Sequence, residues 1–242
     1  MIYCYSCTRT PTNPKVDHTP VINILLKNSI RGAYAELSTR LKNDQSFDDS
    51  EITKANIRIN KIKLDYNEKY RGAQVVSYWN FNYYTNALAI HPGKKYNLYL
   101  ETQEGFIIRG QTTVPDSFRV NFDNNGTITW GKSTNAKYWM LKIVSSKNNI
   151  DIDEKIVFTN KYKLNTDKLE IDEIIDITIN AFDENFYNSN VLGQHSSGID
   201  NGIGTFASSC EISGSACYPV DSAATANQVP PLGSGLAATP PC

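Results

Sequence analysis

Histidine and cysteine are scarce in this chain of 242 residues, which contains three histidines and five cysteines. So few strong ligands leave little room for a centre that holds several metal ions. No cysteine occurs between residues 8 and 209, so disulfides do not brace that body of the chain. The body must therefore be held by hydrophobic packing, and its length suits one domain or two of about 100 residues.

Net charge and long apolar runs are also lacking. The 24 Lys and Arg residues are nearly balanced by 25 Asp and Glu residues, so the formal net charge is -1. We therefore predict no nucleic-acid partner, because general nucleic-acid binders depend on a basic face. No apolar run approaches the roughly 20 residues of a membrane span, so we expect the chain as given not to cross a bilayer.

The charged residues divide the chain into three parts. After Cys210 the only charged side chains are Glu211 and Asp221. Residues 211–242 consist mainly of small residues and proline, and they have too few large apolar groups to offset their ordering entropy. We expect a disordered or irregular low-complexity tail there, either native or of foreign origin. Residues 1–19 lack hydrophobic periodicity, so we expect this segment to be a tether.

The cysteines lie only in or beside these flanking segments. The Cys4-x-x-Cys7 spacing is half of a zinc or redox motif and is weak without a second ligand pair. Tyr5-Ser-Cys7, followed by a polar spacer, resembles the end of a bacterial lipoprotein signal. That resemblance implies lipidation of Cys7 and attachment to a membrane through a lipid anchor; a free exposed thiol is the alternative. Cys210 and Cys217 are close enough in sequence to close a small disulfide loop.

The body of the chain is patterned as β-strands. Apolar and polar residues alternate with period two in many short segments, which are separated by turn signals such as Pro92-Gly93. Only residues 22–41 are ambiguous between helix and strand. Strands at intervals of about 8–12 residues are typical of β-sandwiches. We therefore predict an all-β fold with two consecutive immunoglobulin-like β-sandwiches, at residues 20–115 and 116–210. The clearest strand segments are 57–64, 96–100, 106–108, 118–122, 127–130, 138–144, 155–158 and 174–182.

Several aromatic and apolar positions of the second half follow a known pattern. Trp130 ends the strand Ile128-Thr-Trp130, Tyr138 begins the next, and Leu169 precedes Ile175 by six residues. The second half is in these respects similar to a fibronectin type III domain, with Trp130 on strand B, Tyr138 on strand C and Ile175 on strand F. That family has a tyrosine at the position of Ile175. We therefore expect the hydrogen bond made by that tyrosine to be absent here, and Ile175 to be buried.

Five phrases that follow Cys7 in order resemble a family of Bacteroidetes-type outer-membrane lipoproteins of unknown function. Such proteins often accompany TonB-dependent receptors. The resemblance implies residence at the outer membrane or cell surface and a binding or accessory role, and it supplies no catalytic residue. The phrases are Pro20-Val-Ile-Asn-Ile-Leu-Leu26, Ile52-Thr-Lys-Ala-Asn-Ile57, Pro92-Gly-Lys-Lys-Tyr-Asn-Leu98, Gly110-Gln-Thr-Thr-Val-Pro115 and Asn201-Gly-Ile-Gly-Thr-Phe206.

Groups that carry out catalysis or bind metals do not form a recognisable motif. His18, His91 and His195 are far apart, and His195 occupies the serine position of a Gly-x-Ser-x-Gly pattern, so no nucleophile elbow is present. The acidic clusters at 48–51, 151–154 and 183–185 lack the EF-hand spacing and are typical of solvated faces. We therefore predict no enzyme activity, no metal and no cofactor.

The aromatic stretch at residues 78–84 is the most distinctive candidate for binding. Its rings are Tyr78, Trp79, Phe81, Tyr83 and Tyr84, and asparagines lie between them. Stacked rings beside amide groups suit carbohydrate or peptide ligands, because rings supply contact area and amides fix orientation. The alternative is that one set of rings fills the core of the first sandwich and the rest cover an edge.

These patterns together favour a non-enzymatic lipoprotein of the cell envelope that acts as a binding or accessory module. Its expected partner is an outer-membrane TonB-dependent receptor, or an extracellular polymer or glycan. A structural or adhesive surface protein, in which the sandwiches are spacers of a fibre or matrix, is the alternative. A hydrolase is disfavoured because paired catalytic groups are missing.

Overall fold

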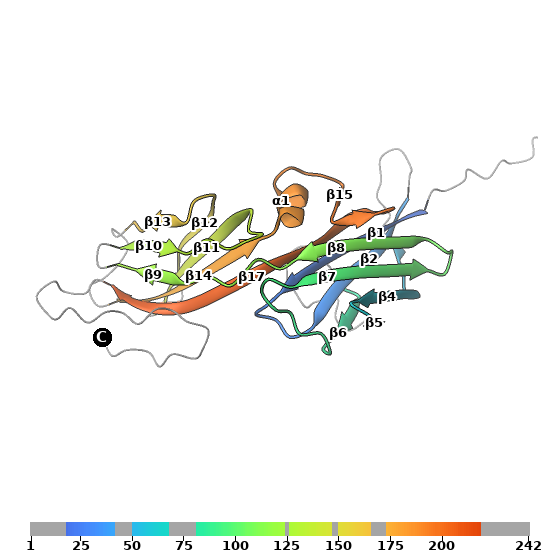
Figure 1. Cartoon of the computed structure of the whole chain (residues 1–242), viewed down its shortest axis with the longest axis horizontal. Helices are drawn as coiled ribbons and strands as arrows, with labels where there is room; N and C mark the ends of the chain where they lie inside the picture. The colour runs from blue at the N-terminus through green and yellow to red at the C-terminus, as the bar shows by residue number, and fades with distance from the viewer. Residues whose placement is uncertain are drawn as a thin grey trace, which may run out of the picture.

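The protein is all-β, as its alternating segments predict. The computed structural model describes residues 18–41, 50–67, 81–123, 126–146, 150–165 and 173–218. Two β-sandwiches lie end to end and give the molecule an elongated shape (Figure 1). In these ranges no helix is long and apolar enough to cross a membrane. The ambiguous segment at 22–41 forms two strands joined by a turn at 28–32.

The first sandwich closes on itself because its edge strands pair with both layers. One layer contains β1, β2 and β6, and the other contains β4, β7 and β8. Strand β5 pairs with both β4 and β6, and on the opposite side β15 pairs with β17 while β16 pairs with β8. The strands are β1 (His18–Lys27), β2 (Ala33–Leu41), β3 (Ser50–Glu51), β4 (Ala55–Ile59), β5 (Ile62–Tyr66), β6 (Tyr83–Thr85), β7 (Lys95–Thr102), β8 (Ile107–Thr113), β15 (Ser196–Ser197), β16 (Ile199–Asp200) and β17 (Ile203–Tyr218).

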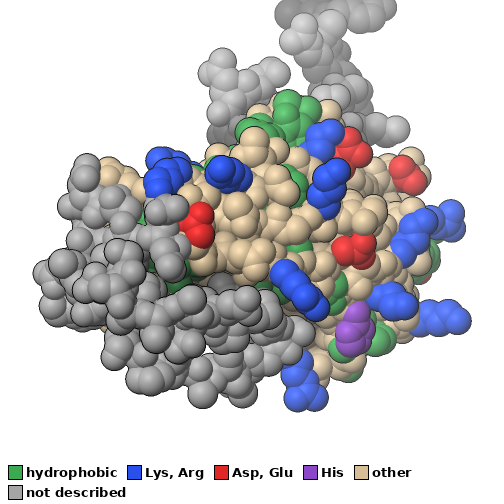
Figure 2. All heavy atoms as spheres, turned by 60° about the vertical axis from the view of Figure 1, so that its left-hand side comes forward, with side chains coloured by type: hydrophobic (Ala, Val, Ile, Leu, Met, Phe, Trp, Pro, Cys, Tyr) green, Lys and Arg blue, Asp and Glu red, His purple; other side chains and the backbone are tan. Residues whose placement is uncertain are grey.

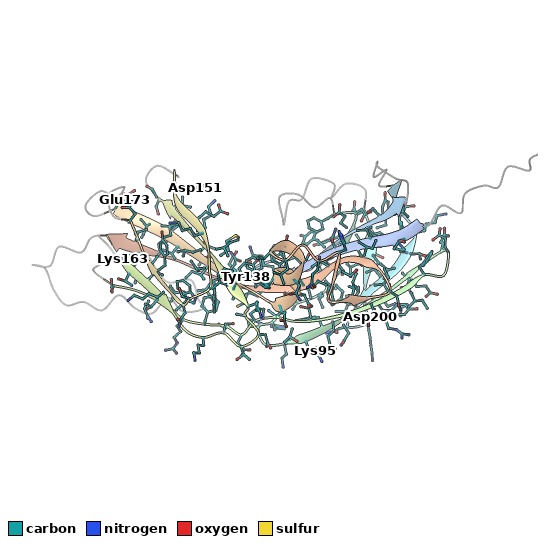
Figure 3. All side chains as sticks on the ribbon, turned by 90° about the horizontal axis from the view of Figure 1, so that it is seen from above. Lys95, Tyr138, Asp151, Lys163, Glu173 and Asp200 are labelled. Atoms are coloured by element: carbon teal, nitrogen blue, oxygen red, sulfur yellow. The ribbon has the colours of Figure 1, made fainter. Side chains whose placement is uncertain are left out.

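The second sandwich packs a three-stranded sheet against a layer that β17 completes, and both layers are visible from above in Figure 3. Trp130 and Ile175 are buried in the core, where the fibronectin type III resemblance places strands B and F. Tyr138 is also buried, but it packs beneath the helix instead of between the sheets. The first sheet contains β9 (Val120–Phe122), β10 (Thr127–Trp130) and β13 (Lys161–Lys163), and the second contains β11 (Tyr138–Ser145), β12 (Ile150–Val157) and β14 (Glu173–Phe182).

Strand β17 belongs to both sandwiches and crosses the whole molecule (Figure 1). Its first half runs parallel to β1, from the pair Val21 and Ile203 to the pair Lys27 and Ser209. Its second half runs antiparallel to β14, beginning where Phe182 pairs with the same Ser209. The predicted end of the second domain at 210 is therefore wrong, because the strand continues through 211–218.

The second half of β17 corrects the prediction of a tail from residue 211 onward. Residues 211–218 are poor in large apolar groups, but they form a full ladder with β14, and Ala216 is buried in the core. Backbone pairing therefore organises a segment whose composition alone predicts disorder. Residues 1–17, including Cys4 and Cys7, and residues 219–242 lie outside the described part of the chain.

The prediction of a disulfide between Cys210 and Cys217 is wrong. Both residues lie on β17, where Cys210 pairs with Ala181 and Cys217 pairs with Ile174. A strand rises about 3.3 Å per residue, so their Cα atoms are far beyond the roughly 7 Å that a disulfide can span. Cys210 is a buried free thiol, whereas Cys217 is disulfide-bonded. Burial, together with the negative charges of Asp116 and Glu211, raises the pKa of Cys210 to about 11.

A cluster of aromatic side chains, separate from the main hydrophobic core, packs the two sandwiches together beneath α1 (Glu184–Asn190). Phe182 at the end of β14 stacks on Phe186 of the helix, with 4.5 Å between ring centroids. Tyr138 stacks on Phe182 at 5.1 Å. Leu25 of β1, Phe81 before β6 and Ala207 of β17 complete the cluster from the first sandwich. The halves therefore share apolar packing as well as a strand.

We predict that alanine at Gly204 disrupts the contact between β17 and β1. Gly204 has φ +117, and a Cβ there would lie 2.0 Å from the carbonyl oxygen of Ile22. Gly105 also has positive φ, but a Cβ there meets nothing within 4 Å. We expect Gly204→Ala to lower the free energy of unfolding by about 3–5 kcal/mol, and Gly105→Ala by only about 1 kcal/mol. Urea denaturation followed by circular dichroism measures both, and equal losses would contradict the close approach.

Candidate functional site

A polar pocket of about 320 Å³ lies at the junction of the two sandwiches. One wall comes from the end of β8 in the first sandwich, and the other from the loop before β11 and from the start of α1. Figure 1 shows α1 over this junction, where β8 approaches the second sandwich. The lining residues are Gln111, Thr112, Thr113, Asn135, Ala136, Lys137, Asp183, Glu184 and Asn185. Both sandwiches therefore contribute to one site.

The buried carboxylate of Asp183 joins the elements that form this pocket. Its Oδ1 accepts a hydrogen bond from the backbone N–H of Phe186 at 2.9 Å, which caps α1. Its Oδ2 accepts from the backbone N–H and the hydroxyl of Ser208 on β17, both at 3.1 Å. The hydroxyl of Thr112 on β8 also donates to Oδ2. One side chain thus connects the first sandwich, the shared strand and the helix; we call this set of contacts the Asp183 clasp.

The environment of Asp183 changes its titration. Burial raises the pKa of this carboxyl from 3.8 to about 6, although the hydrogen bonds from Thr112, Phe186 and Ser208 act in the opposite direction. Desolvation disfavours the charged form, whereas donors favour it. The carboxyl is therefore ionised at neutral pH and takes up a proton in mildly acidic solution.

Asn185 and Lys137 fix the rim of the pocket. The amide of Asn185 donates to the carbonyl oxygens of Gln111 at 2.8 Å and Phe206 at 2.9 Å, and so ties α1 to β8 and β17. The ammonium of Lys137 lies 3.5 Å from a carboxylate oxygen of Glu184, and both side chains are about half exposed or more. The rim therefore offers one cation, one anion and several amides.

The structure corrects the ligand-binding interpretation for two of the predicted aromatic residues. Phe81 and Tyr83 are each 1% exposed, so they fill the core and offer no surface to a ligand. Tyr84 is half-buried and packs on Tyr34, with 4.7 Å between ring centroids. Between the buried rings, the amide of Asn82 pairs with the backbone N–H and carbonyl of Leu37 at 2.8 and 2.7 Å. Residues 78 and 79 lie outside the described part of the chain.

The other predicted groups are dispersed. His91 and His195 are exposed in separate loops, and Cys7 is outside the described ranges. Where the structure describes the chain, no three His, Cys, Asp or Glu side chains are placed to hold a metal ion. Only the acidic cluster at 183–185 lies in the pocket. The prediction of a solvated face is wrong for Asp183, which is buried there, and nothing in the sequence points to its partner Thr112, which is 71 residues away.

Comparison with known proteins gives no family for this chain: no protein-family model matches it, and no curated protein is significantly similar.

We predict that Asp183→Asn removes a pH dependence of stability. Between pH 3.8 and about 6 the folded chain keeps a proton on Asp183 that the unfolded chain has lost. The contribution of this group to the free energy of unfolding is therefore largest below pH 4, and it falls as the pH rises through 6. The free energy of unfolding of the wild type minus that of the variant should fall by about 2 kcal/mol from pH 4 to pH 7.

Urea denaturation at several pH values measures this difference. The exposed Asp200→Asn serves as the control, for which the difference should stay nearly constant. A constant difference for Asp183→Asn as well would show that the carboxyl titrates normally.

Proposed function

We propose that the protein is a non-enzymatic binding module of the bacterial cell envelope, and that its junction pocket binds an extended segment of an outer-membrane TonB-dependent receptor. The observation that carries this proposal is a polar pocket whose walls come from both sandwiches. Support for the envelope comes from the resemblance of Cys7 to a lipidation site and from the five ordered phrases.

The chemistry of the pocket suits a peptide segment. A peptide presents N–H and C=O groups in alternation, and the amide of Asn135 can pair with both. Lys137 and Glu184 add opposite charges that select a complementary segment. A volume of about 320 Å³ lies at the low end of small-molecule pockets, so a short stretch of chain fits better than an enclosed ligand.

The rigidity of the pocket supports recognition of a partner. The walls cannot separate freely, because β17 runs through both sandwiches and the Asp183 clasp links β8 to α1. A site that is already in its bound geometry loses less entropy when it binds. The four hydrogen bonds to Asp183 come from the fold itself, which favours a structural role for this carboxylate over a catalytic one.

A second candidate function is that of an adhesive or spacer protein, and an open sheet edge favours it. Among the strands that the structure describes, β12 ends the large sheet and pairs only with β11. Ile156 and Phe158, at and just beyond its end, are 54% and 59% exposed. An exposed apolar strand edge is a template for pairing with another chain. In this alternative, copies of the protein would join through β12.

We predict that reversing the charges of the rim weakens receptor binding without unfolding the protein. The double variant Lys137→Glu/Glu184→Lys keeps an ion pair at the rim but exchanges its polarity. Its affinity for the receptor should fall about tenfold or more. The receptor is captured from detergent-solubilised outer membranes with the full chain and identified by mass spectrometry, and affinities are then measured by biolayer interferometry.

Lys161→Glu/Glu154→Lys, on exposed residues of the second sandwich, is the matched control and should bind as the wild type does. Failure to capture a TonB-dependent receptor, or equal affinities of all the variants, would argue against the proposed function.

We predict, for the spacer alternative, self-association that depends on β12. Sedimentation velocity over a range of concentrations should then show oligomers for the wild type and monomers for Ile156→Lys, because a charge on an edge strand blocks pairing. Leu192→Lys, at a similarly exposed residue beyond α1, should not change the association. A wild-type protein that stays monomeric at every concentration would remove this alternative.

A further inference from the structure

The outer face of the β4–β7–β8 layer carries a row of cations around one aromatic ring. Arg58 of β4 pairs with Tyr99 of β7, and Tyr99 pairs with Arg109 of β8. On the far side Arg58 pairs with Lys63 of β5. Directly opposed residues point to the same face with their Cβ atoms about 5 Å apart. The ring of Tyr99 is therefore flanked by two guanidinium groups; we call Lys63, Arg58, Tyr99 and Arg109 the basic row.

Most of the cations on this face have no carboxylate partner. Lys63 pairs with Asp65 at 3.0 Å. Arg58, Lys61, Lys95 and Arg109, by contrast, form no ion pair with any residue that the structure describes. Basic side chains also outnumber acidic ones on the face of the molecule shown in Figure 2. Unpaired cations gathered on one exposed face favour an anionic ligand.

The ring of Tyr99 is held in place. Its hydroxyl donates to Glu101 at 2.9 Å. This hydrogen bond raises the pKa of Tyr99, while the charges of Arg109 and Arg58 act in the opposite direction. Both guanidinium charges are therefore felt at the phenol, in agreement with the strand register. A fixed ring flanked by cations is a ready stacking surface.

A depression of about 680 Å³ adjoins the basic row, and Lys95 lies on this outer side of the layer in Figure 3. The side-chain amides of Asn60 and Asn97 line this depression. Asn60 accepts a hydrogen bond from the backbone N–H of Asn97 at 2.9 Å, and the Asn97 side chain accepts one from Gln111 at 3.0 Å. None of the described residues that line the depression is a carboxylate; they are Arg58, Asn60, Lys61, Lys95, Asn97, Leu98 and Tyr99.

We infer that this face binds an acidic polysaccharide whose carboxylates pair with Arg58 and Arg109, while a sugar ring stacks on Tyr99 and hydroxyl groups meet the amides. Arginine forks match carboxylates in two parallel hydrogen bonds. The inference rests on the proposed function, because it assigns a ligand class to a second surface of the same binding module.

The mixture of charges on the face favours a polysaccharide over a nucleic acid or a lipid surface. Glu101 lies beside the basic row, and Asp200 of β16 lies opposite Arg109 in the strand register without forming an ion pair with it. Duplex DNA carries one charge per about 1.7 Å, so such carboxylates would meet its phosphates. A uronic-acid polymer carries at most one carboxylate per sugar, which leaves neutral hydroxyls to lie beside Glu101 and the amides.

We predict that the full chain binds polygalacturonate, alginate or hyaluronate. Polygalacturonate whose carboxylates are all methyl-esterified should bind at least tenfold more weakly than unesterified polygalacturonate. Isothermal titration calorimetry at fixed salt measures each affinity. Arg58→Gln/Arg109→Gln should weaken binding about tenfold or more, because it removes charge-assisted hydrogen bonds. Tyr99→Ala should also weaken binding, whereas Tyr99→Phe, which keeps the ring, should retain most of it.

Arg119→Gln/Lys132→Gln removes the same net charge from exposed residues between β8 and β11 and should bind as the wild type does. Absence of binding to all three polymers would overturn the inference. Equal weakening by this control, or equal affinity for a DNA duplex or for phosphatidylglycerol vesicles, would do so as well. Receptor capture depends on the Lys137 rim, so failure with the polysaccharides leaves the test of the proposed function intact.

Discussion

The backbone hydrogen bonds along β17 hold the two halves of the molecule in one structure. The strand completes a layer of the first sandwich through β1 and a layer of the second through β14, and the exchange of partners occurs at Ser209. Gly204 permits the close approach to Ile22 that this arrangement requires. The aromatic cluster and the Asp183 clasp lie beside the exchange point, so both depend on the course of this strand.

The polar surfaces follow from this geometry. The junction pocket exists because the end of β8 and the start of α1 are held together through Ser208 and Asp183. The basic row exists because three strands of the other layer are in a register that aligns Arg58, Tyr99 and Arg109. Gln111 belongs to both surfaces, since it lines the pocket and donates to Asn97. A partner at the junction and a polymer on the sheet would therefore be neighbours.

Local patterns explain how much of this fold the sequence predicts. Alternation identifies β7, β11 and β14. The strand segment expected at 57–64 is divided into β4 and β5 by a turn at Asn60-Lys61, where both residues have positive φ. The second half of β17 has no such alternation, because its small residues are held by a ladder instead of by apolar burial. The clasp could not be predicted either, since its donors are distant in sequence. The sequence contains the two arginines of the basic row, but only the strand register shows that both lie beside the ring of Tyr99.

The parallel pairing of β1 with β17 has a consequence for how the chain folds. The first strand of the described chain pairs with the last, so this contact has nearly the largest sequence separation that the described residues allow. Such contacts form slowly, because the loop between them must be closed before any hydrogen bond is gained. One edge of β1 therefore stays open until the C-terminal strand has been made. During that interval the nascent chain exposes an apolar strand edge with which another copy can pair.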